Sequence, residues 1–155
     1  MSNRYSFEFF PPKTPAGKEK LKTVREELGK LNPEFFSCTY GAGGSTRDNT
    51  LDTISVMREE GFSIAPHLSF GGDDEASILE LIEHYKSLGV DRIVALRGDL
   101  PSGMGASRLV YAQELVEFIR KHTGEHFHLE VAAYPEIHPD AKNYEHDINC
   151  LKAKF

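Results

Sequence analysis

Short apolar runs recur along this chain about every 30 residues, and a polar side chain stands at or just beyond the end of each run. These polar residues are Glu8, Thr39, His67, Asp99 and Tyr134. A strand, a helix and their two loops together need about 30 residues. Parallel strands bring their carboxyl ends to the same edge of a sheet, so the pattern predicts one active site built from several strand ends.

The hydrophobic periodicity alternates between strand and helix along the whole chain. We predict strands over 4–10, 35–40, 63–69, 92–96 and 128–134. Helices are predicted over 18–31, 47–60, 74–88 and 108–121, with a fifth helix that begins near 143. Strict alternation of strands and helices implies an α/β protein with a parallel sheet.

Two architectures fit this alternation, a doubly wound open sheet and a (β/α)8 TIM barrel. A dinucleotide-binding open sheet would carry its glycine-rich turn after the first strand, but that turn reads FFPPKT. Polar groups at every strand end favour the barrel. A barrel needs eight units and about 250 residues. We therefore expect residues 1–155 to form one catalytic barrel domain, truncated to about the first five β/α units and incomplete at the C-terminus.

Composition narrows the classes of function. The net charge is −6 without a basic cluster, which argues against nucleic-acid binding. No apolar run is long enough to span a bilayer, and the N-terminus does not resemble a signal peptide. We expect Cys38 and Cys150 to be reduced core residues of a cytoplasmic protein that binds no membrane. No second histidine or cysteine stands at ligand spacing from His67, so no metal is expected.

Two of the strand ends carry acidic side chains that are candidates for a role in catalysis or binding. Glu8 lies within SFEFF, where the flanking aromatics would remove water from the carboxyl and suit it to a general acid. The alternative is an edge-strand glutamate that faces solvent. Arg97 and Asp99 directly follow a buried strand, and burying such a charge pair is costly unless it serves a site.

Three other segments allow either a binding role or a structural one. The glycine-rich loop in TYGAGGSTRD is either a close backbone approach to a ligand or a plain turn before a helix. His67 is either a ligand contact or a hydrogen-bonded core residue. Tyr134 and His138 in AAYPEIHPDAK would cover a planar ring or belong to a proline-rich turn.

Together these segments resemble the methylenetetrahydrofolate reductase family of bacterial type. The motifs FEFFPPKT, FFSCTYGAGGSTRD, APHLSF, LRGDLPSG and AAYPEIHPDAK come in the order and at the intervals of that family. The resemblance runs from Ser6 to Lys154, nearly the whole chain. Any one motif would be weak evidence for the family, but five motifs in the family's order and spacing are specific to it.

The resemblance implies an oxidoreductase in which a barrel holds FAD and NADH or NADPH is the reductant. The reaction would convert 5,10-methylenetetrahydrofolate to 5-methyltetrahydrofolate, in one-carbon and methionine metabolism. Glu8 matches the catalytic acid, and Asp99 matches an aspartate that contacts the folate beside the flavin. The family also commonly forms homo-oligomers. The residues that match FAD contacts are Thr39, His67, Arg97, Gly98, Asp99, Tyr111, Ala112, Tyr134, His138, Ala141, Asp147, Asn149 and Lys154.

Other interpretations remain beside this one. Another FAD-binding barrel oxidoreductase, such as a proline-dehydrogenase-like enzyme, and a folate-dependent methyltransferase share the scaffold, although FEFFPP together with LRGD disfavours both. A truncated product without catalytic activity is the alternative from a different class. From the residues alone, Asp147 and Lys154 are interpreted as surface charges, and only the resemblance assigns them to a site.

Overall fold

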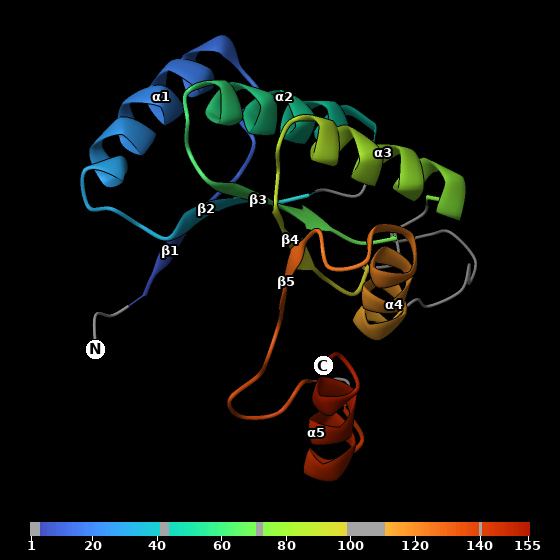
Figure 1. Cartoon of the computed structure of the whole chain (residues 1–155). Helices are drawn as coiled ribbons and strands as arrows, with labels where there is room; N and C mark the ends of the chain where they lie inside the picture. Colours follow the sequence, from blue (N-terminus) through green and yellow to red (C-terminus); the bar gives the residue numbers. More distant parts are fainter. Residues whose placement is uncertain (1–3, 41–43, 71–72, 99–110, 140) are drawn as a thin grey trace.

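The computed structural model describes residues 4–40, 44–70, 73–98, 111–139 and 141–155, with only the backbone of 44–46. Its strands form a single sheet in which each strand pairs in parallel with the next one along the chain (Figure 1). The strands are β1 (Ser6–Phe9), β2 (Phe35–Cys38), β3 (Ile64–Leu68), β4 (Arg92–Ala95) and β5 (His128–Val131). The predicted α/β class is confirmed.

The strand order decides between the two architectures that the sequence allows. In a doubly wound sheet the order reverses at a switch point, whereas in a barrel each strand lies beside its predecessor. The described sheet has the order β1-β2-β3-β4-β5 without a reversal. The structure therefore confirms five β/α units of the barrel type, and the doubly wound alternative is wrong.

A helix follows each strand, and local sequence explains where two of the helices begin. The helices are α1 (Pro15–Gly29), α2 (Gly44–Glu59), α3 (Glu75–Ser87), α4 (Ala112–Thr123) and α5 (Tyr144–Lys152). Thr14 caps α1 by accepting the Gly17 N–H at 3.1 Å, and Pro15 takes the first helical position, which needs no N–H donor. Asp74 caps α3 in the same way, through the Ser77 N–H at 2.8 Å.

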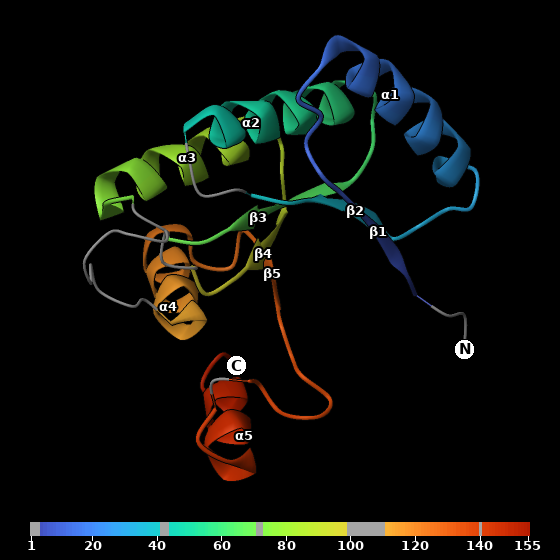
Figure 2. The ribbon, with the colours of Figure 1, turned by 180° about the vertical axis from the view of Figure 1, so that it is seen from behind.

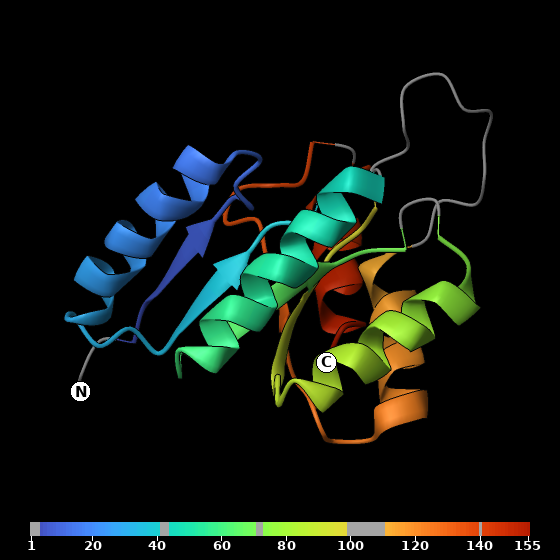
Figure 3. The same ribbon diagram turned by 90° about the horizontal axis from the view of Figure 1, so that it is seen from above.

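Helices α1 to α4 are arranged around one side of the sheet. In Figure 1, α1, α2 and α3 lie next to one another over the same face, and α4 takes the next position around it. The view from above shows the same succession of α1, α2 and α3 (Figure 3). Seen from behind, α5 lies apart from these three helices, beyond the long connection that leaves β5 (Figure 2). Helices on the outside of a sheet that grows in one direction are typical of a barrel wall.

Alternation along the strands gives the sheet two chemically different faces. One face packs against the helices and supplies the apolar core, which includes Phe9, Phe36, Ile64, Leu68 and Ile93. We call the opposite face the inner face. Strand register and alternation place on the inner face Glu8, Ser37, His67, Val94 and Glu130.

All the predicted strands and helices are present, but some boundaries differ. Helix α1 begins at Pro15, earlier than predicted, because Thr14 and Pro15 form its start. Strand β5 ends at Val131, so Tyr134 lies in the following loop rather than at the strand end. The predicted start of the fourth helix, at 108, lies outside the described residues. Within the described part of the chain, no helix has the length and apolarity that crossing a membrane requires.

Candidate functional site

Glu8 and His67 meet on the inner face of the sheet. Glu8 belongs to β1 and His67 to β3, and β2 lies between these two strands. His67 Nε2 is 3.2 Å from Glu8 Oε2, which is within reach for sharing a proton. The His67 side chain is only 10% exposed, whereas that of Glu8 is 54% exposed. The pair thus joins a buried imidazole to a carboxylate that solvent or a ligand can approach.

The expected aromatic enclosure of Glu8 is wrong. Phe7 and Phe9 alternate with Glu8 along β1, so their rings pack on the helix-covered face. The Phe9 ring stacks on Phe36 with 5.2 Å between the centroids. Consequently the carboxyl is not desolvated by its sequence neighbours, and its described partner is an imidazole from another strand.

Burial controls the protonation of His67. Its removal from solvent lowers the pKa of His67 below the ordinary value of 6.5, and the nearby Glu8 carboxylate opposes this effect. The net lowering favours the neutral imidazole at neutral pH. A neutral imidazole has one N–H donor and one acceptor nitrogen, so it can serve a neighbouring carboxyl without adding a permanent charge.

Thr39 fixes the point where the glycine-rich loop leaves β2. Its N–H donates to the Phe9 carbonyl at 2.9 Å, and its own carbonyl accepts the Thr50 hydroxyl at 3.0 Å. These bonds tie β1, the end of β2 and helix α2 together. Residues 41–43 of the loop itself lie outside the described residues. The half-buried Thr39 side chain is therefore held at the carboxyl edge of the sheet, as predicted from its position.

The predicted charge pair after β4 can be described only in part. Arg97 and Gly98 are half-buried and directly follow the strand. Leu96 donates its N–H to the Leu68 carbonyl at 2.9 Å, which extends the pairing of β4 with β3 up to this point. Asp99, the predicted folate contact, lies outside the described residues.

Two aromatic groups meet in the loop after β5. The rings of Tyr134 and His138 stand edge to face with centroids 4.6 Å apart. Ala141 donates its N–H to the His138 carbonyl at 2.9 Å and so closes a turn. Tyr134 is exposed, which leaves its ring available to a planar ligand.

Helix α5 and the turn that follows it are attached to this loop by two charged residues. Asp147 Oδ2 accepts the His138 N–H at 3.1 Å, and Lys154 Nζ donates to the Ala132 carbonyl at 2.9 Å. Each of these two surface charges holds a backbone group of the loop in place. Asn149 is exposed on the same helix.

The remaining predicted contacts lie at the start of α4. Tyr111 is the N-cap residue and is exposed, while the adjacent Ala112 is buried. Tyr111 donates its N–H to Glu114 Oε2 at 3.0 Å, which fixes the first turn. The segment that leads into this turn, 99–110, lies outside the described residues.

The sequence did not point to a link between two loops at the carboxyl edge. The Tyr40 hydroxyl donates to Asp73 Oδ2 at 2.7 Å, and Arg47 Nη1 lies 3.9 Å from the other oxygen of that carboxylate. Tyr40 follows β2 and Asp73 precedes α3, so the link joins consecutive β/α loops. The one sequence feature that could have indicated this link is a tyrosine directly before the glycine-rich loop.

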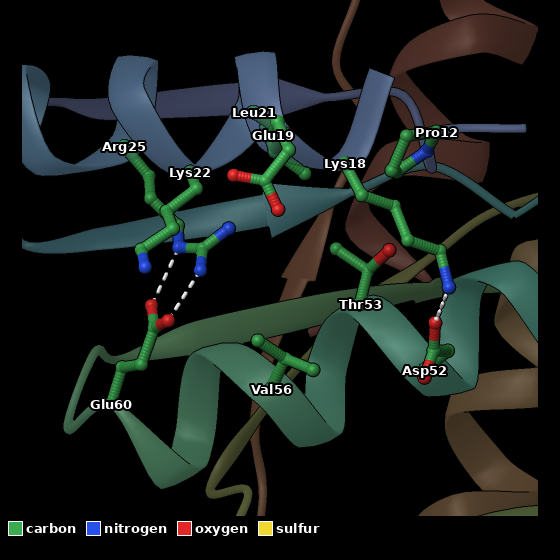
Figure 4. Close-up of a pocket in the computed structure, with 10 residues that line it drawn as sticks. All are labelled: Pro12, Lys18, Glu19, Leu21, Lys22, Arg25, Asp52, Thr53, Val56 and Glu60. Atoms are coloured by element: carbon green, nitrogen blue, oxygen red, sulfur yellow. Dashed lines mark hydrogen bonds and ion pairs between the residues drawn. The ribbon is translucent and has the colours of Figure 1, made fainter. Parts of the chain in front are cut away.

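A cavity of about 210 Å³ lies elsewhere, between α1 and α2 on the outside of the sheet (Figure 4). Ion pairs cross it from Arg25 to Glu60 and from Lys18 to Asp52. It contains none of the predicted site residues. Among the described residues, no group of three or more metal-ligating side chains is present anywhere.

Comparison with known proteins shows the family to which the chain belongs. The family model described as methylenetetrahydrofolate reductase matches residues 1–155. The chain belongs to this family. The resemblance predicted from five sequence motifs is confirmed, and the proline-dehydrogenase-like and methyltransferase interpretations are set aside.

Curated relatives agree with the family match. The chain is 42% identical to the 5,10-methylenetetrahydrofolate reductase of Pectobacterium carotovorum subsp. carotovorum, over 97% of this chain and 50% of the relative. It is 39% identical to the protein of that name from Escherichia coli (strain K12), over 96% and 50% of the two chains. It is 36% identical to methylenetetrahydrofolate reductase (NADH) 1 of Arabidopsis thaliana, over 97% and 28%. The chain thus spans about half the length of the bacterial relatives it matches.

Proposed function

We propose that the complete protein, meaning the full polypeptide that contains this chain, reduces 5,10-methylenetetrahydrofolate to 5-methyltetrahydrofolate. The observation that carries this proposal is the Glu8 carboxylate, held against buried His67 on the inner face, in a chain of the methylenetetrahydrofolate reductase family. The two bacterial relatives are named for this folate. The role in one-carbon and methionine metabolism is part of the same proposal.

Glu8 is the proposed catalytic acid. Opening the five-membered ring of the folate requires a proton on the departing nitrogen, and a positioned carboxylic acid is a suitable donor. The exposed Glu8 side chain can reach a ligand bound over the inner face. Asp99, which follows β4, is proposed as the second catalytic and folate-binding residue.

The described residues fit a flavin dinucleotide as the cofactor. The Tyr134 and His138 rings offer an aromatic surface, and the half-buried Arg97 offers a cation suited to phosphate. FAD would supply hydride transfer between the reductant and the folate. The chain would bind and orient it through Thr39, His67, Arg97, Gly98, Asp99, Tyr111, Ala112, Tyr134, His138, Ala141, Asp147, Asn149 and Lys154.

The reductant in this proposal is NADH or NADPH. The relatives from Arabidopsis thaliana and Zea mays carry NADH in their names. We further propose that residues 1–155 belong to a single catalytic barrel domain of a cytoplasmic homo-oligomer. The free thiols of Cys38 and Cys150 fit a reducing compartment.

Two separate half-reactions test the proposal on the purified complete protein. Its absorbance spectrum should show bound flavin. Mixing it anaerobically with NADH or NADPH should bleach the flavin, and adding 5,10-methylenetetrahydrofolate should restore the colour as 5-methyltetrahydrofolate forms.

Glu8→Gln assigns the acid role within this experiment. We expect the folate step to slow by about 10²-fold or more, since general acid catalysis contributes that much, while flavin reduction stays unchanged. Glu27→Gln, an exposed glutamate on α1, is the matched control and should change neither step. Equal loss of both steps in Glu8→Gln would contradict the acid role, and absence of folate-dependent reoxidation in the unaltered protein would overturn the function.

A further inference from the structure

We propose that His67 is a positioning residue for Glu8, which holds one carboxyl oxygen and so leaves the other free to carry the proton to the substrate. This inference rests on the proposed function and adds to it a second role for His67, distinct from contact with a flavin. It follows from three properties of the pair: which oxygen is held, how firmly the imidazole is fixed, and which charge the imidazole carries.

The contact uses only one of the two Glu8 oxygens. His67 Nε2 lies 3.2 Å from Oε2. Within the described residues, Oε1 makes no hydrogen bond or ion pair, and the side chain is 54% exposed. A carboxyl group protonated on Oε1 still presents Oε2 as an acceptor. His67 can therefore hold Glu8 both before and after the proton leaves, without giving up its own ring proton.

The imidazole is a firmer support than the carboxylate. His67 lies within β3, which has paired strands on both sides, β2 and β4. The His67 side chain is 10% exposed, whereas that of Glu8 is 54% exposed. An exposed glutamate has several rotamers available, and fixing one of them reduces the entropy lost on reaching the reactive geometry.

The surroundings of His67 favour a neutral N–H donor rather than an imidazolium. On the inner face, β2 presents Ser37, and β4 presents Val94 in register with His67. The cation that alternation places on the inner face of β4 is Arg92, which is occupied by ion pairs to Glu34 and Glu130.

Among the described residues, Glu8 is the charged group that faces the imidazole at close range, and burial lowers the pKa of His67 despite this neighbour. A neutral donor does not hold Glu8 permanently in its ionised form, as a fixed cation would. The arrangement is thus compatible with a carboxyl that must alternate between acid and base.

The first test uses two variants of the complete protein at saturating FAD. His67→Gln keeps an N–H donor near the position of Nε2, and His67→Leu removes it. We expect the folate half-reaction to fall at least about 100-fold in His67→Leu and less than about 10-fold in His67→Gln. Flavin reduction should fall less than the folate half-reaction in His67→Leu, because the loss of a flavin contact would act on both half-reactions and the loss of the Glu8 contact on the folate step alone. The pH profile of the folate step should be displaced in His67→Leu and recovered in His67→Gln.

A double variant distinguishes a role of His67 in positioning Glu8 from a general loss of activity caused by the substitution. If His67 acts through Glu8, adding His67→Leu to Glu8→Gln should cost little more than Glu8→Gln alone. The proposal would be overturned if the loss of rate in the double variant equalled the product of the losses in the two single variants. Equal losses of both half-reactions in His67→Leu would also overturn it.

A measurement without turnover tests the contact itself. The ring nitrogens of His67 can be followed by ¹⁵N NMR as the pH is changed. The negative charge of Glu8 should raise the pH midpoint of His67, so Glu8→Gln should lower it. Identical midpoints would overturn the contact, whatever the protein catalyses. A protein without folate turnover but with a displaced midpoint would overturn the proposed function and leave the contact standing.

Discussion

Arg92 and Glu34 are joined across the sheet, with Arg92 Nη2 lying 3.0 Å from Glu34 Oε1. Glu34 directly precedes β2, and Arg92 is the first residue of β4, so the pair spans β3. The same guanidinium also pairs with Glu130 of β5 and lies 4.5 Å from the centre of the Phe35 ring. One side chain therefore connects β2, β4 and β5 on the side of the sheet where Glu8 and His67 lie.

Replacing Arg92 by Met should destabilise the complete protein. Its side chain is 16% exposed, and its loss leaves the carboxylates of Glu34 and Glu130 without their shared cation. We expect a loss of about 2 kcal/mol, below the full cost of breaking a buried pair because both carboxylates retain some solvent. Urea unfolding measures it. Arg4→Met is the control, because Arg4 also pairs with Glu34 but is 78% exposed; its cost should stay below about 1 kcal/mol. Equal costs would refute the central role of Arg92.

Glu60 should make the stability of the protein depend on pH in the acidic range. The Arg25 side chain donates to Glu60, at 2.6 Å from Nε to Oε2, and this hydrogen bond is the main reason why the pKa of Glu60 lies below its ordinary value of 4.5. A lowered pKa in the folded state adds stability above about pH 4.5, and this contribution is lost as the pH falls through the folded-state pKa.

Glu60→Gln removes this dependence and tests it. It should lower stability near pH 7 by about 1 kcal/mol and flatten the decline between about pH 5 and pH 3. Urea unfolding over this range provides the measurement. Glu59→Gln, at the neighbouring exposed position, should preserve the decline. An unchanged pH dependence in Glu60→Gln would show that the pair does not stabilise the fold.

Cys38 should be inert in the folded protein. Burial, with a smaller effect of the Glu8 carboxylate, raises the pKa of Cys38 to about 12 from an ordinary value of 9.0. The thiolate is the reactive form, so its fraction near neutral pH falls about a thousandfold. In a Cys150→Ser background, iodoacetamide should label Cys38 rapidly in urea and hardly at all under native conditions, as followed by mass spectrometry. Similar labelling rates in both conditions would contradict the burial of this thiol.

Tyr85 offers a substitution that should stabilise the protein. Its hydroxyl is fully buried in the core, and the described residues provide no hydrogen-bond partner for it. Removing an unsatisfied buried hydroxyl avoids its desolvation cost, so Tyr85→Phe should add about 1 kcal/mol to the free energy of unfolding. Tyr40→Phe is the matched comparison and should lose about 1 kcal/mol, because its hydroxyl donates to Asp73. A destabilised Tyr85→Phe variant would mean that this hydroxyl is satisfied.

Periodicity was sufficient to predict the fold, because each β/α unit carries its own pattern and the strand order follows the chain. The arrangement of the site was harder to predict from the sequence. The sequence placed Glu8 beside aromatic residues, but alternation turns those rings to the other face and brings His67 to the carboxylate from a different strand. Contacts of this kind depend on register, which a single sequence does not display.

Long-range polar contacts were the least predictable part. Nothing in the local sequence separates Asp147 and Lys154 from ordinary charges on a helix, yet they hold the His138 N–H and the Ala132 carbonyl. The same is true of Arg92, whose partners come from two other segments. Local propensity has no information about such partners, because they are defined by the packed structure.

The consecutive strand order has a consequence for synthesis on the ribosome. In the described sheet, each of β2 to β5 pairs with the strand made just before it, so none of these four strands must wait for a distant segment to emerge. The loops that must close are those within single β/α units, which keeps their entropic cost small. A nascent chain of this design can extend its sheet one unit at a time, with each new strand adding to an edge that has already formed.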